Sequence, residues 1–564
     1  MAEKSDSYVC GISDAPLLGD TIGRSLDRAV QRWSDREALI SPSHGVRWTW
    51  SELAERVDAL AAGFLALGLE RGQRIGIWSL NRPEWTLTQF AAAKAGLILV
   101  TINPAYRLSE LEFALRKVGC TAIVTATAFK TSNYMEMLNT LLPELPVAEP
   151  GQLQAARLPA LRNVIQIGGP AAAGTIPFDE VARMGGDRHR RQLDALGHEL
   201  QFDDPVNIQF TSGTTGSPKG VTLTHHNILN NGYFTGRAMR LTEQDRICIP
   251  VPLYHCFGMV MGNLASVTLG AAMVYPGEGF DPLATLRTIE QEKCSALYGV
   301  PTMFIAELDH PEFKSFDLKS LRTGIMAGAP CPIEVMKRVN NAMNMREVTI
   351  AYGMTETSPV SFQSAVDDPL ERRVSTVGRI HPHVEVKVVD LEGKIVKRGE
   401  RGELCTRGYS VMLGYWEESE KTADVLDANG WMHTGDLATI DDEGYCNIVG
   451  RIKDMVIRGG ENLYPREIEE FLYRHPKIQD VQIFGVADSR YGEELCAWVR
   501  VRPGEQMTAD EVRAFCEGQI AHNKIPRYVE FVDEFPMTVT GKIQKFLMRE
   551  EVEQRLGLKA AKTA

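Results

Sequence analysis

The sequence lacks three features that would each point to a particular class of protein: paired cysteines, long uninterrupted apolar runs and an excess of basic residues. Its ten cysteines are scattered, with no C-x-x-C pair, which fits a reduced cytosol and argues against a thiolate zinc site or a disulfide scaffold. The longest apolar runs, 91–102 and 257–274, are interrupted by Lys94, Asn263 and several glycines, so neither is a clean membrane span. Residues 1–6 show no basic stretch leading into an apolar run, so no secretory signal is apparent and a cytoplasmic location is expected.

The charge balance excludes one more class. A net charge of −12 argues against a general nucleic-acid binder, because no basic excess is available to neutralise a phosphate backbone. It leaves room for a local basic pocket that binds a nucleotide. The length of 564 residues exceeds what one hydrophobic core supports, so at least two domains are expected.

Helical and strand-like patterns alternate over much of the chain, which predicts parallel βαβ layers. A helix beginning at Ser109 is expected to carry a capping box with Glu112, whereas 134–200, with its Pro, Gly and Ala clusters, is expected to be a long connection. The other elements expected here are helices at 51–67, at 84–95 and from Gly258 to Leu269, and strands at 74–80, 97–102, 121–125, 206–210, 246–250, 272–275, 296–298, 323–326 and 347–350.

Two later stretches have a different pattern. Residues 376–416 contain short β runs with glycines at the turns, which predicts an antiparallel or barrel-like unit. Past Arg451 the chain predicts a separate α+β module, whose second helix opens with a capping box of Thr508 and Glu511. The expected elements of this module are helices at 466–474 and 508–519 and strands at 481–486 and 495–502.

The loop 211–220 is suited to bind an anion. It contains five hydroxyl side chains, three glycines and one lysine; glycines let backbone N–H groups approach a phosphate, hydroxyls donate to it, and lysine adds a charge. It differs from the common nucleoside-triphosphate loop, because Lys219 lies between Pro218 and Gly220 instead of before Ser or Thr. The alternative is a surface loop without a function.

Four further motifs accompany this loop. In 352–356, an adjacent hydroxyl and carboxylate beyond a strand suit a phosphate oxygen and its divalent cation; the alternative is a capped helix start at Thr355. In 431–436, Asp436 on a glycine turn suits ribose hydroxyls, or forms an ordinary Asx turn.

In 450–454, charged residues at a change of architecture suit nucleotide contact and a hinge, or a solvated linker. In 536–543, Lys542 on a glycine turn is either functional or a surface lysine.

In this order and at these separations, the five motifs resemble the adenylate-forming superfamily of acyl-CoA synthetases, luciferases and peptide-synthetase adenylation domains, roughly over residues 20–550. The segment 459–469 is most similar to the medium-chain fatty acyl-CoA synthetase branch, including acyl-CoA synthetase family member two. The resemblance implies a large N-terminal domain, 1–452, of layered α/β subdomains plus a β-barrel-like unit. It also implies a small mobile C-terminal α+β lid domain, 453–564.

The resemblance assigns a nucleotide site to named residues. Tyr352 with Gly353 would stack on adenine, and Asp436 would bind the ribose hydroxyls with Arg451 beside it. Adenine and the acyl chain would also contact Gly328, Ala329 and Pro330, after Ala327 where the family often has glycine. The β- and γ-phosphates would be held by Thr211, Ser212, Gly213, Thr214, Thr215, Gly216 and Lys219.

The resemblance assigns the chemistry as well. Thr355 would bind the α-phosphate, and Glu356 would hold Mg²⁺. Lys542 would reach the substrate carboxylate in the first half-reaction, and the lid would then rotate about Lys453. The remaining two assignments belong to CoA, which would enter past Gly460 and the gate residue His255.

The implied reaction is an ATP-dependent acyl-CoA synthesis in fatty acid metabolism. The acid attacks the α-phosphorus of ATP and releases pyrophosphate, and the CoA thiol then attacks the acyl-adenylate and releases AMP. The apolar segments 257–264 and 298–301 could line an acyl tunnel or belong to the core. Because no further Arg or Lys is placed for a second carboxylate, a medium-chain fatty acid is expected. An aryl, branched or thioether acid stays open.

Three alternatives keep some of these motifs. A stand-alone adenylating enzyme would load a carrier protein, a luciferase-like enzyme would oxidise the adenylate, and a scaffold would bind nucleotide without catalysis. The scaffold is disfavoured because Lys219, Glu356, Asp436, Arg451 and Lys542 are all present. Monomer or homodimer, and a weak peripheral contact with a membrane, are left open.

Overall fold

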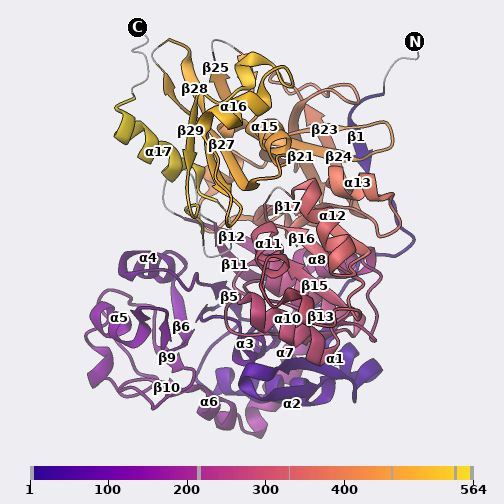
Figure 1. The fold of residues 1–564 in the computed structure, drawn as a ribbon. Helices are drawn as coiled ribbons and strands as arrows, with labels where there is room; N and C mark the ends of the chain where they lie inside the picture. The colour runs from indigo at the N-terminus through magenta and orange to yellow at the C-terminus, as the bar shows by residue number, and fades with distance from the viewer. Residues whose placement is uncertain are drawn as a thin grey trace.

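The computed structural model describes residues 5–211, 218–329, 331–458, 461–488, 490–538 and 543–558. Within these ranges the chain forms four sheets of five or more strands and one short hairpin, β7 (Ala128–Phe129) with β8 (Ser132–Asn133). Two large sheets with their helices form the lower part of the view in Figure 1, and the C-terminal residues, drawn in gold, form a separate layer above them.

The first large sheet is parallel except at one edge, where two antiparallel strands complete it. One of them, β12 (Lys219–Thr224), comes directly after the hydroxyl-rich loop. In spatial order the strands are β10 (Ile176–Pro177), β9 (Asn163–Gln166), β6 (Cys120–Thr125), β4 (Arg74–Trp78), β5 (Ile98–Thr101), β11 (Pro205–Thr211), β12 (Lys219–Thr224) and β22 (Gly414–Tyr415).

The second large sheet is parallel in its centre and antiparallel at both edges. In spatial order its strands are β19 (Arg379–Ile380), β18 (Val360–Gln363), β17 (Glu347–Gly353), β16 (Thr323–Ala327), β15 (Ala296–Gly299), β13 (Arg246–Cys248), β14 (Ala272–Val274), β2 (Glu37–Ser41) and β3 (Val46–Thr49). The predicted parallel βαβ layers are therefore confirmed.

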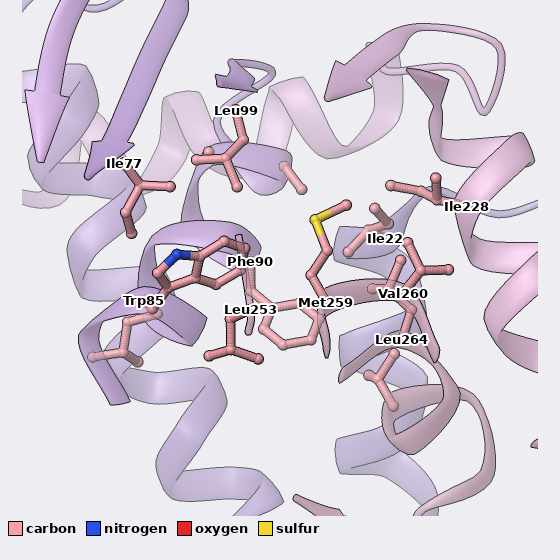
Figure 2. Close-up of a cluster of buried hydrophobic side chains, with 14 of the residues drawn as sticks. Ile22, Ile77, Trp85, Phe90, Leu99, Ile228, Leu253, Met259, Val260 and Leu264 are labelled. Atoms are coloured by element: carbon pink, nitrogen blue, oxygen red, sulfur yellow. The ribbon is translucent and has the colours of Figure 1, made fainter. Parts of the chain in front are cut away.

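Helices cover both faces of these sheets, which explains why central strands such as β5 are buried at every position. Figure 2 shows part of the core between the two sheets, where Ile77 and Leu99 lie near Phe90 and Met259. The helices packed in this core are α1 (Ile22–Trp33), α2 (Trp50–Ala66), α3 (Pro83–Lys94), α8 (His225–Ala238), the π-helix η3 (Phe257–Leu264) and α9 (Ala265–Leu269).

The remaining N-terminal helices lie around this core, and three of them contribute Phe178, Val181, Leu193 and Met303 to it. On the outer face of the first sheet are α4 (Leu108–Val118) and α5 (Tyr134–Leu141), and on that of the second are α10 (Pro282–Glu292), α11 (Pro301–Leu308) and α12 (Ile333–Ala342). The others are α6 (Phe178–Met184) and α7 (Asp187–Glu199), which contact α2, and the short α13 (Leu370–Ser375) and α14 (Ser419–Ala423). Among the described residues, none of the helices has both the length and the apolar character that crossing a membrane requires.

The third sheet is antiparallel throughout, as predicted for 376–416. In the described chain its edges are β1 and β24, so of the two forms expected, antiparallel or barrel-like, it is an open antiparallel sheet. Its strands, in order, are β1 (Tyr8–Cys10), β20 (Val384–Val389), β21 (Gly402–Gly408), β23 (Met432–Ile440) and β24 (Cys446–Arg451).

The C-terminal module is the predicted α+β unit. Along β27, Val481 and Ile483 face one hydrophobic cluster while Phe484 and Val486 face another, so the sheet carries helices on both faces. Its strands are β26 (Glu461–Leu463), β25 (Val456–Arg458), β28 (Gly492–Val501), β27 (Ile478–Asp488) and β29 (Tyr528–Phe531), and its helices are α15 (Pro465–Leu472), α16 (Ala509–Cys516) and α17 (Lys545–Leu556). The Thr508–Glu511 capping box is confirmed.

Two local predictions were wrong. Residues 134–200 contain α5, β9, β10, α6 and α7 instead of a long connection. The helix α4 is capped two residues earlier than expected, at Arg107 instead of Ser109: Glu110 accepts from the Arg107 N–H at 2.9 Å. Glu112 does not take part in the cap; its carboxylate forms an ion pair with Arg157, which is distant in sequence.

Candidate active site

The hydroxyl-rich loop is anchored by two paired strands. Thr211, the last residue of β11, and Lys219, the first of β12, are cross-strand partners. The pairing brings the two ends of the loop together, as a phosphate-binding turn requires. Most of the predicted phosphate ligands, Ser212, Gly213, Thr214, Thr215 and Gly216, lie outside the described residues.

Tyr415 connects this lysine to the predicted magnesium ligand. The Lys219 Nζ lies 4.5 Å from the centre of the Tyr415 ring, within the range of a cation–π contact. The Tyr415 hydroxyl donates to Glu356 Oε1 at 3.0 Å. Burial, and then the Glu356 carboxylate, raise the pKa of Tyr415, so the hydroxyl stays protonated and keeps donating. The loop stem and the carboxylate are thereby held in one place.

Thr355 and Glu356 lie on a single 3₁₀ turn, η5 (Thr355–Thr357), directly after β17. Glu356 is 6% exposed, and a buried carboxylate is costly without a compensating cation or donors. Mg²⁺ in nucleotide sites is held by one or two carboxylates together with substrate phosphates. The position and burial of Glu356 therefore fit a magnesium ligand.

Tyr352, Asp436 and Arg451 form a second cluster. The Tyr352 hydroxyl donates to Asp436 Oδ2 at 2.6 Å, and Arg451 Nε lies 3.1 Å from Asp436 Oδ1. Burial, and then the Asp436 carboxylate, raise the pKa of Tyr352 well above its ordinary value. The aspartate is buried yet keeps two donors, which is the condition for a stable charged group.

Asp436 is not on a glycine turn, contrary to the local expectation. It lies inside β23, directly opposite Arg451 of β24. Gly435 before it has a left-handed φ of 70°, and the strand pairing shifts register just after it, between Leu437 and Ala438. A bulge of this kind redirects a side chain within a strand, which explains how the motif looked like a turn.

The segment predicted to contact adenine follows the neighbouring strand. Ala327 of β16 pairs with Ala351 of β17, so Gly328 and Tyr352 emerge at the carboxyl ends of adjacent parallel strands, where α/β sheets bind ligands. Gly328 has a φ of 86°, a conformation that favours glycine. Gly353 is the last residue of β17, Ala329 is half-buried, and Pro330 lies outside the described residues.

His255, the predicted gate residue, lies next in sequence to Cys256, which contacts Thr355. Its Nδ1 accepts from the Phe257 N–H at 3.2 Å, which fixes the ring at the start of the π-helix. Burial raises the pKa of the adjacent Cys256 thiol to about 12, and that thiol is hydrogen-bonded to Thr355. The structure therefore places Cys256, the neighbour of His255, against the turn that carries Thr355 and Glu356.

The apolar segment that follows packs as core. Phe257 stacks on Tyr298 with ring centres 5.7 Å apart, and Tyr298 donates to the Met261 carbonyl at 2.9 Å. Figure 2 shows Met259 among buried side chains from several elements. Gln209 Nε2 of β11 lies 3.6 Å from Met259 Sδ, which connects this core to the strand before the phosphate loop.

The hinge position lies between two sheets. Lys453 belongs to η6 (Ile452–Asp454), the 3₁₀ turn that joins β24 to β25. The module beyond it contacts the N-terminal part through Arg466, which donates to the Ile448 carbonyl at 2.8 Å, and through Gln479, which donates to Asp309 at 3.2 Å. Gly460 and Lys542 lie outside the described residues, and the boundary at 452/453 stays a prediction.

Comparison with known sequences identifies the family. The family described as "AMP-binding enzyme" matches residues 26–416, and "AMP-binding enzyme C-terminal domain" matches residues 467–542. The chain belongs to the AMP-binding enzyme family. Its clusters around Glu356 and Asp436 are therefore the nucleotide-site candidates of an AMP-binding enzyme.

Among AMP-binding enzymes, two relatives named as acyl-CoA enzymes match this chain over almost its whole length. The zebrafish (Danio rerio) protein "Medium-chain acyl-CoA ligase ACSF2, mitochondrial" is 50% identical over 98% of this chain and 91% of its own length. The Bacillus subtilis protein "Putative acyl-CoA synthetase YngI" is 47% identical over 97% of this chain and 100% of its own.

Solved structures of AMP-binding enzymes share the fold. The anthranilate CoA ligase AuaEII in complex with anthranoyl-AMP has a TM-score of 0.86 at 26% identity, over 97% of this chain and 99% of that one. The Mycobacterium tuberculosis fatty acyl CoA synthetase has a TM-score of 0.71 at 28% identity, over 95% of this chain and 99% of that one.

Sequence reasoning missed Tyr415. This tyrosine follows one of the glycines of 376–416, and a tyrosine after a glycine carries no motif signal. Only the pairing of β22 with β12, Val221 opposite Tyr415, places this ring beside Lys219. The contact joins residues almost two hundred positions apart, so no local pattern could have shown it.

Proposed function

We propose that this protein activates a medium-chain fatty acid as its acyl-adenylate and transfers the acyl group to CoA. That the protein is an AMP-forming acyl-CoA ligase follows from its family and from full-length relatives with that activity in their names. The observation that supports medium-chain acids is the 50% identity over 98% of the chain to a protein named medium-chain acyl-CoA ligase.

In this proposal, Asp436 binds the two ribose hydroxyls of ATP. Tyr352 holds one carboxylate oxygen through its hydroxyl, and Arg451 balances the charge from the opposite strand. The adenine lies against Tyr352 and Gly353 on one side and Gly328, Ala329 and Pro330 on the other. Both groups emerge at adjacent strand ends, which supports one shared nucleotide site.

The phosphates lie between the loop and η5. Lys219, positioned by the Tyr415 ring, neutralises charge on the β- and γ-phosphates together with the loop residues 211–216. Thr355 donates to the α-phosphate. Glu356 is the residue that would hold Mg²⁺, and the metal, when bound, offsets negative charge on the phosphate oxygens.

The chemistry then proceeds in two half-reactions. The acid carboxylate attacks the α-phosphorus and expels pyrophosphate, and Lys542 stabilises the charge that accumulates. The lid rotates about Lys453, so that CoA enters beside Gly460 and past His255. The thiol attacks the mixed anhydride and AMP leaves. One site cannot hold both geometries, which is why a rotation is needed.

The acceptor and the cellular setting also belong to the proposal. CoA is preferred over a carrier protein because both named relatives are acyl-CoA enzymes. Several relatives are named mitochondrial, while the cytoplasmic location expected for this chain stays a prediction. The oligomeric state, monomer or homodimer, and a weak membrane contact also stay predictions.

The experiment is pyrophosphate release with ATP and Mg²⁺ over linear acids of increasing length and aryl, branched and thioether acids, with and without CoA. We expect a maximum at mid-length linear acids, with acyl-CoA and AMP formed only when CoA is present. Asp436→Asn should raise the ATP KM without moving the chain-length maximum. A maximum on aryl acids would reject the medium-chain proposal, and release without acyl-CoA formation would reject CoA as the acceptor.

A further inference from the structure

Three side chains of the third sheet converge outside the nucleotide clusters. Glu403 and Cys405 stand two residues apart on β21, so they share a face of the strand. His433 of β23 is the cross-strand partner of Cys405, and the pairing shifts register between Glu403 and Cys405. The shift brings the glutamate toward the same histidine. One oxygen, one sulfur and one nitrogen ligand atom thus gather from two strands.

The three ligand atoms are close enough together to share one metal ion. All three ligand atoms lie within 4.8 Å of one another; His433 Nδ1 is 2.9 Å from Glu403 Oε2 and 3.5 Å from Cys405 Sγ. In a tetrahedral zinc site, with Zn–S of about 2.3 Å and Zn–N of about 2.0 Å, sulfur and nitrogen ligands stand about 3.5 Å apart. The cysteine and histidine already have this separation, and the glutamate must retreat by a few tenths of an ångström. We propose that Glu403, Cys405 and His433 bind a divalent transition metal of the zinc type.

The donor set selects this class of ion. A thiolate and an imidazole favour zinc and similar metals over Mg²⁺ or Ca²⁺, which take oxygen ligands. The side chains of His433 and Glu403 are 35% and 23% exposed, so an ion enters from solvent and a water completes the coordination. Cys405 itself is buried, which fixes its sulfur at the inner side of the site.

The surrounding charges are mixed. Lys387 lies opposite Cys405 on β20 and opposes a cation, but its Nζ is turned over the Trp431 ring at 4.5 Å. Asp427 also acts on the thiol, with the opposite sign. The two carboxylates, Glu403 and Asp427, outnumber the one lysine, Lys387, so these three groups together carry a net negative charge before the metal binds.

Binding must release a proton. Burial raises the pKa of the Cys405 thiol to about 12, so the free site holds S–H. The sulfur–metal bond forms as the S–H bond breaks, and that proton goes to solvent. The thiol proton therefore leaves when a metal binds, and the apparent affinity rises with pH.

The site is coupled to the ribose-binding position. The second oxygen of Glu403 accepts from the Gly435 N–H at 3.1 Å, and Thr434 accepts from the Asp436 N–H at 3.1 Å. When Glu403 turns to a metal, it loosens its hold on this segment and weakens ATP binding. This consequence, unlike the metal site, depends on the proposed role of Asp436.

The direct test is a Co²⁺ titration of the full-length protein in a Cys10→Ser background, which removes the exposed thiol among the ten cysteines. We expect one equivalent of Co²⁺ to give tetrahedral d–d bands and a thiolate-to-cobalt charge-transfer band, both abolished by Zn²⁺. Cys405→Ser should abolish the charge-transfer band, and His433→Gln should weaken binding at least tenfold. Cys446→Ser, a buried cysteine of the neighbouring strand, is the matched control and should leave the spectrum unchanged.

The metal site would be overturned if the bands were absent in the Cys10→Ser protein. It would also be overturned if they persisted in both Cys405→Ser and His433→Gln. The proton count is independent of the variants, and a titration that releases no proton would also contradict the site. For the coupling, stoichiometric Zn²⁺ should raise the ATP KM in Cys10→Ser but not after Cys405→Ser is added. An unchanged KM would reject the coupling alone, and an inactive enzyme that still binds Co²⁺ would reject only the proposed function.

Discussion

Among the tyrosines that donate to buried carboxylates, Tyr352 in the candidate active site and Tyr445 outside it form a matched pair. Tyr352 donates to Asp436 at 2.6 Å, and Tyr445 donates to Asp368 at 2.7 Å. The two pairs have similar geometry and similarly buried acceptors, 5% exposed in each case. They therefore form a matched comparison between a bond that serves the nucleotide and one that serves the fold.

Replacing each tyrosine by phenylalanine separates these roles. Both variants should lose about 1.5–3 kcal/mol of unfolding free energy, the range for a hydrogen bond to a charged group. Only Tyr352→Phe should raise the ATP KM, by about three- to tenfold, because Asp436 is no longer held for the ribose hydroxyls. Urea unfolding and initial rates over a range of ATP concentrations measure the two effects. An equal rise of the ATP KM in Tyr445→Phe would contradict the assignment.

A second residue-scale prediction concerns pH. Glu307 of α11 is 1% exposed, and burial raises the pKa of its carboxyl well above its ordinary value of 4.5. The folded state keeps a proton that the unfolded state loses above that pH, so its contribution to stability falls as the pH rises toward the folded-state pKa. Glutamine mimics the protonated acid and does not titrate. The stability advantage of Glu307→Gln over the natural protein should therefore grow between pH 5 and pH 8.

The control for this prediction is Glu312→Gln, because Glu312 is exposed in the same region. Its unfolding free energy should follow that of the natural protein at every pH. Denaturant titrations at four or more pH values measure both differences. A difference between Glu307→Gln and the natural protein that stays constant with pH would show that Glu307 is ionised when buried.

Among the elements, the crossing of α8 with the π-helix shapes the core beside the site. A Cβ on Gly232 would lie 2.9 Å from both the Val260 carbonyl oxygen and the Ala265 nitrogen, and neither backbone atom can give way without moving η3. Gly197 of α7 is the contrast, because a Cβ added there would meet open space among the described residues.

Alanine at these two glycines should have opposite effects. Gly232→Ala should lower the unfolding free energy by about 1–3 kcal/mol through overpacking, because η3 must move. Gly197→Ala should raise stability by about 0.5–1 kcal/mol, the gain from replacing glycine within a helix. Thermal unfolding measures both effects. Unchanged stability in Gly232→Ala would mean that the crossing relaxes more easily than the packing implies.

The elements that sequence reasoning found are those with a strong apolar pattern. Strands such as β5, buried at all four positions, and amphipathic helices such as α2 were predicted within a few residues. The region 134–200 was misjudged because β10 has two residues and α7 buries only Leu193. Neither has enough apolar periodicity to be detected, and both are stabilised by tertiary contacts instead.

The same limit applies to the candidate site. Lys219, Glu356, Asp436 and Arg451 stood in recognisable motifs, because their chemistry needs fixed local spacing. Tyr415 had none, since it reaches Glu356 through strand pairing. The Glu403, Cys405 and His433 cluster was hidden for a similar reason: its donors come from two strands, and the search for C-x-x-C pairs does not detect a single cysteine.

For the whole molecule, the reaction requires the C-terminal module to act in only one half-reaction. Lys542→Ala should slow adenylate formation by about 10²–10³-fold, the usual cost of losing one transition-state donor. It should leave acyl transfer from supplied acyl-adenylate to CoA within a few-fold of normal. Pyrophosphate release and thioester formation, measured separately, report the two steps. Lys524→Ala is the control, since that lysine pairs with Glu467 at the surface and surface pairs contribute little.

Loss of both half-reactions to the same extent would contradict the rotation. Lys542 would then serve a geometry common to both steps. The contacts of Arg466 with Ile448 and of Gln479 with Asp309 would have to persist throughout the cycle. Under the proposal they belong to one orientation of the module and break in the other.

The central claim is that the acid carboxylate attacks the α-phosphorus of ATP, and oxygen labelling tests it most directly. Octanoate labelled with ¹⁸O in its carboxylate is incubated with the protein, ATP, Mg²⁺ and CoA, and the products are analysed by mass spectrometry. The account predicts one labelled oxygen in AMP, one in octanoyl-CoA and none in pyrophosphate. Unlabelled AMP, or label in inorganic phosphate formed with ADP, would contradict it.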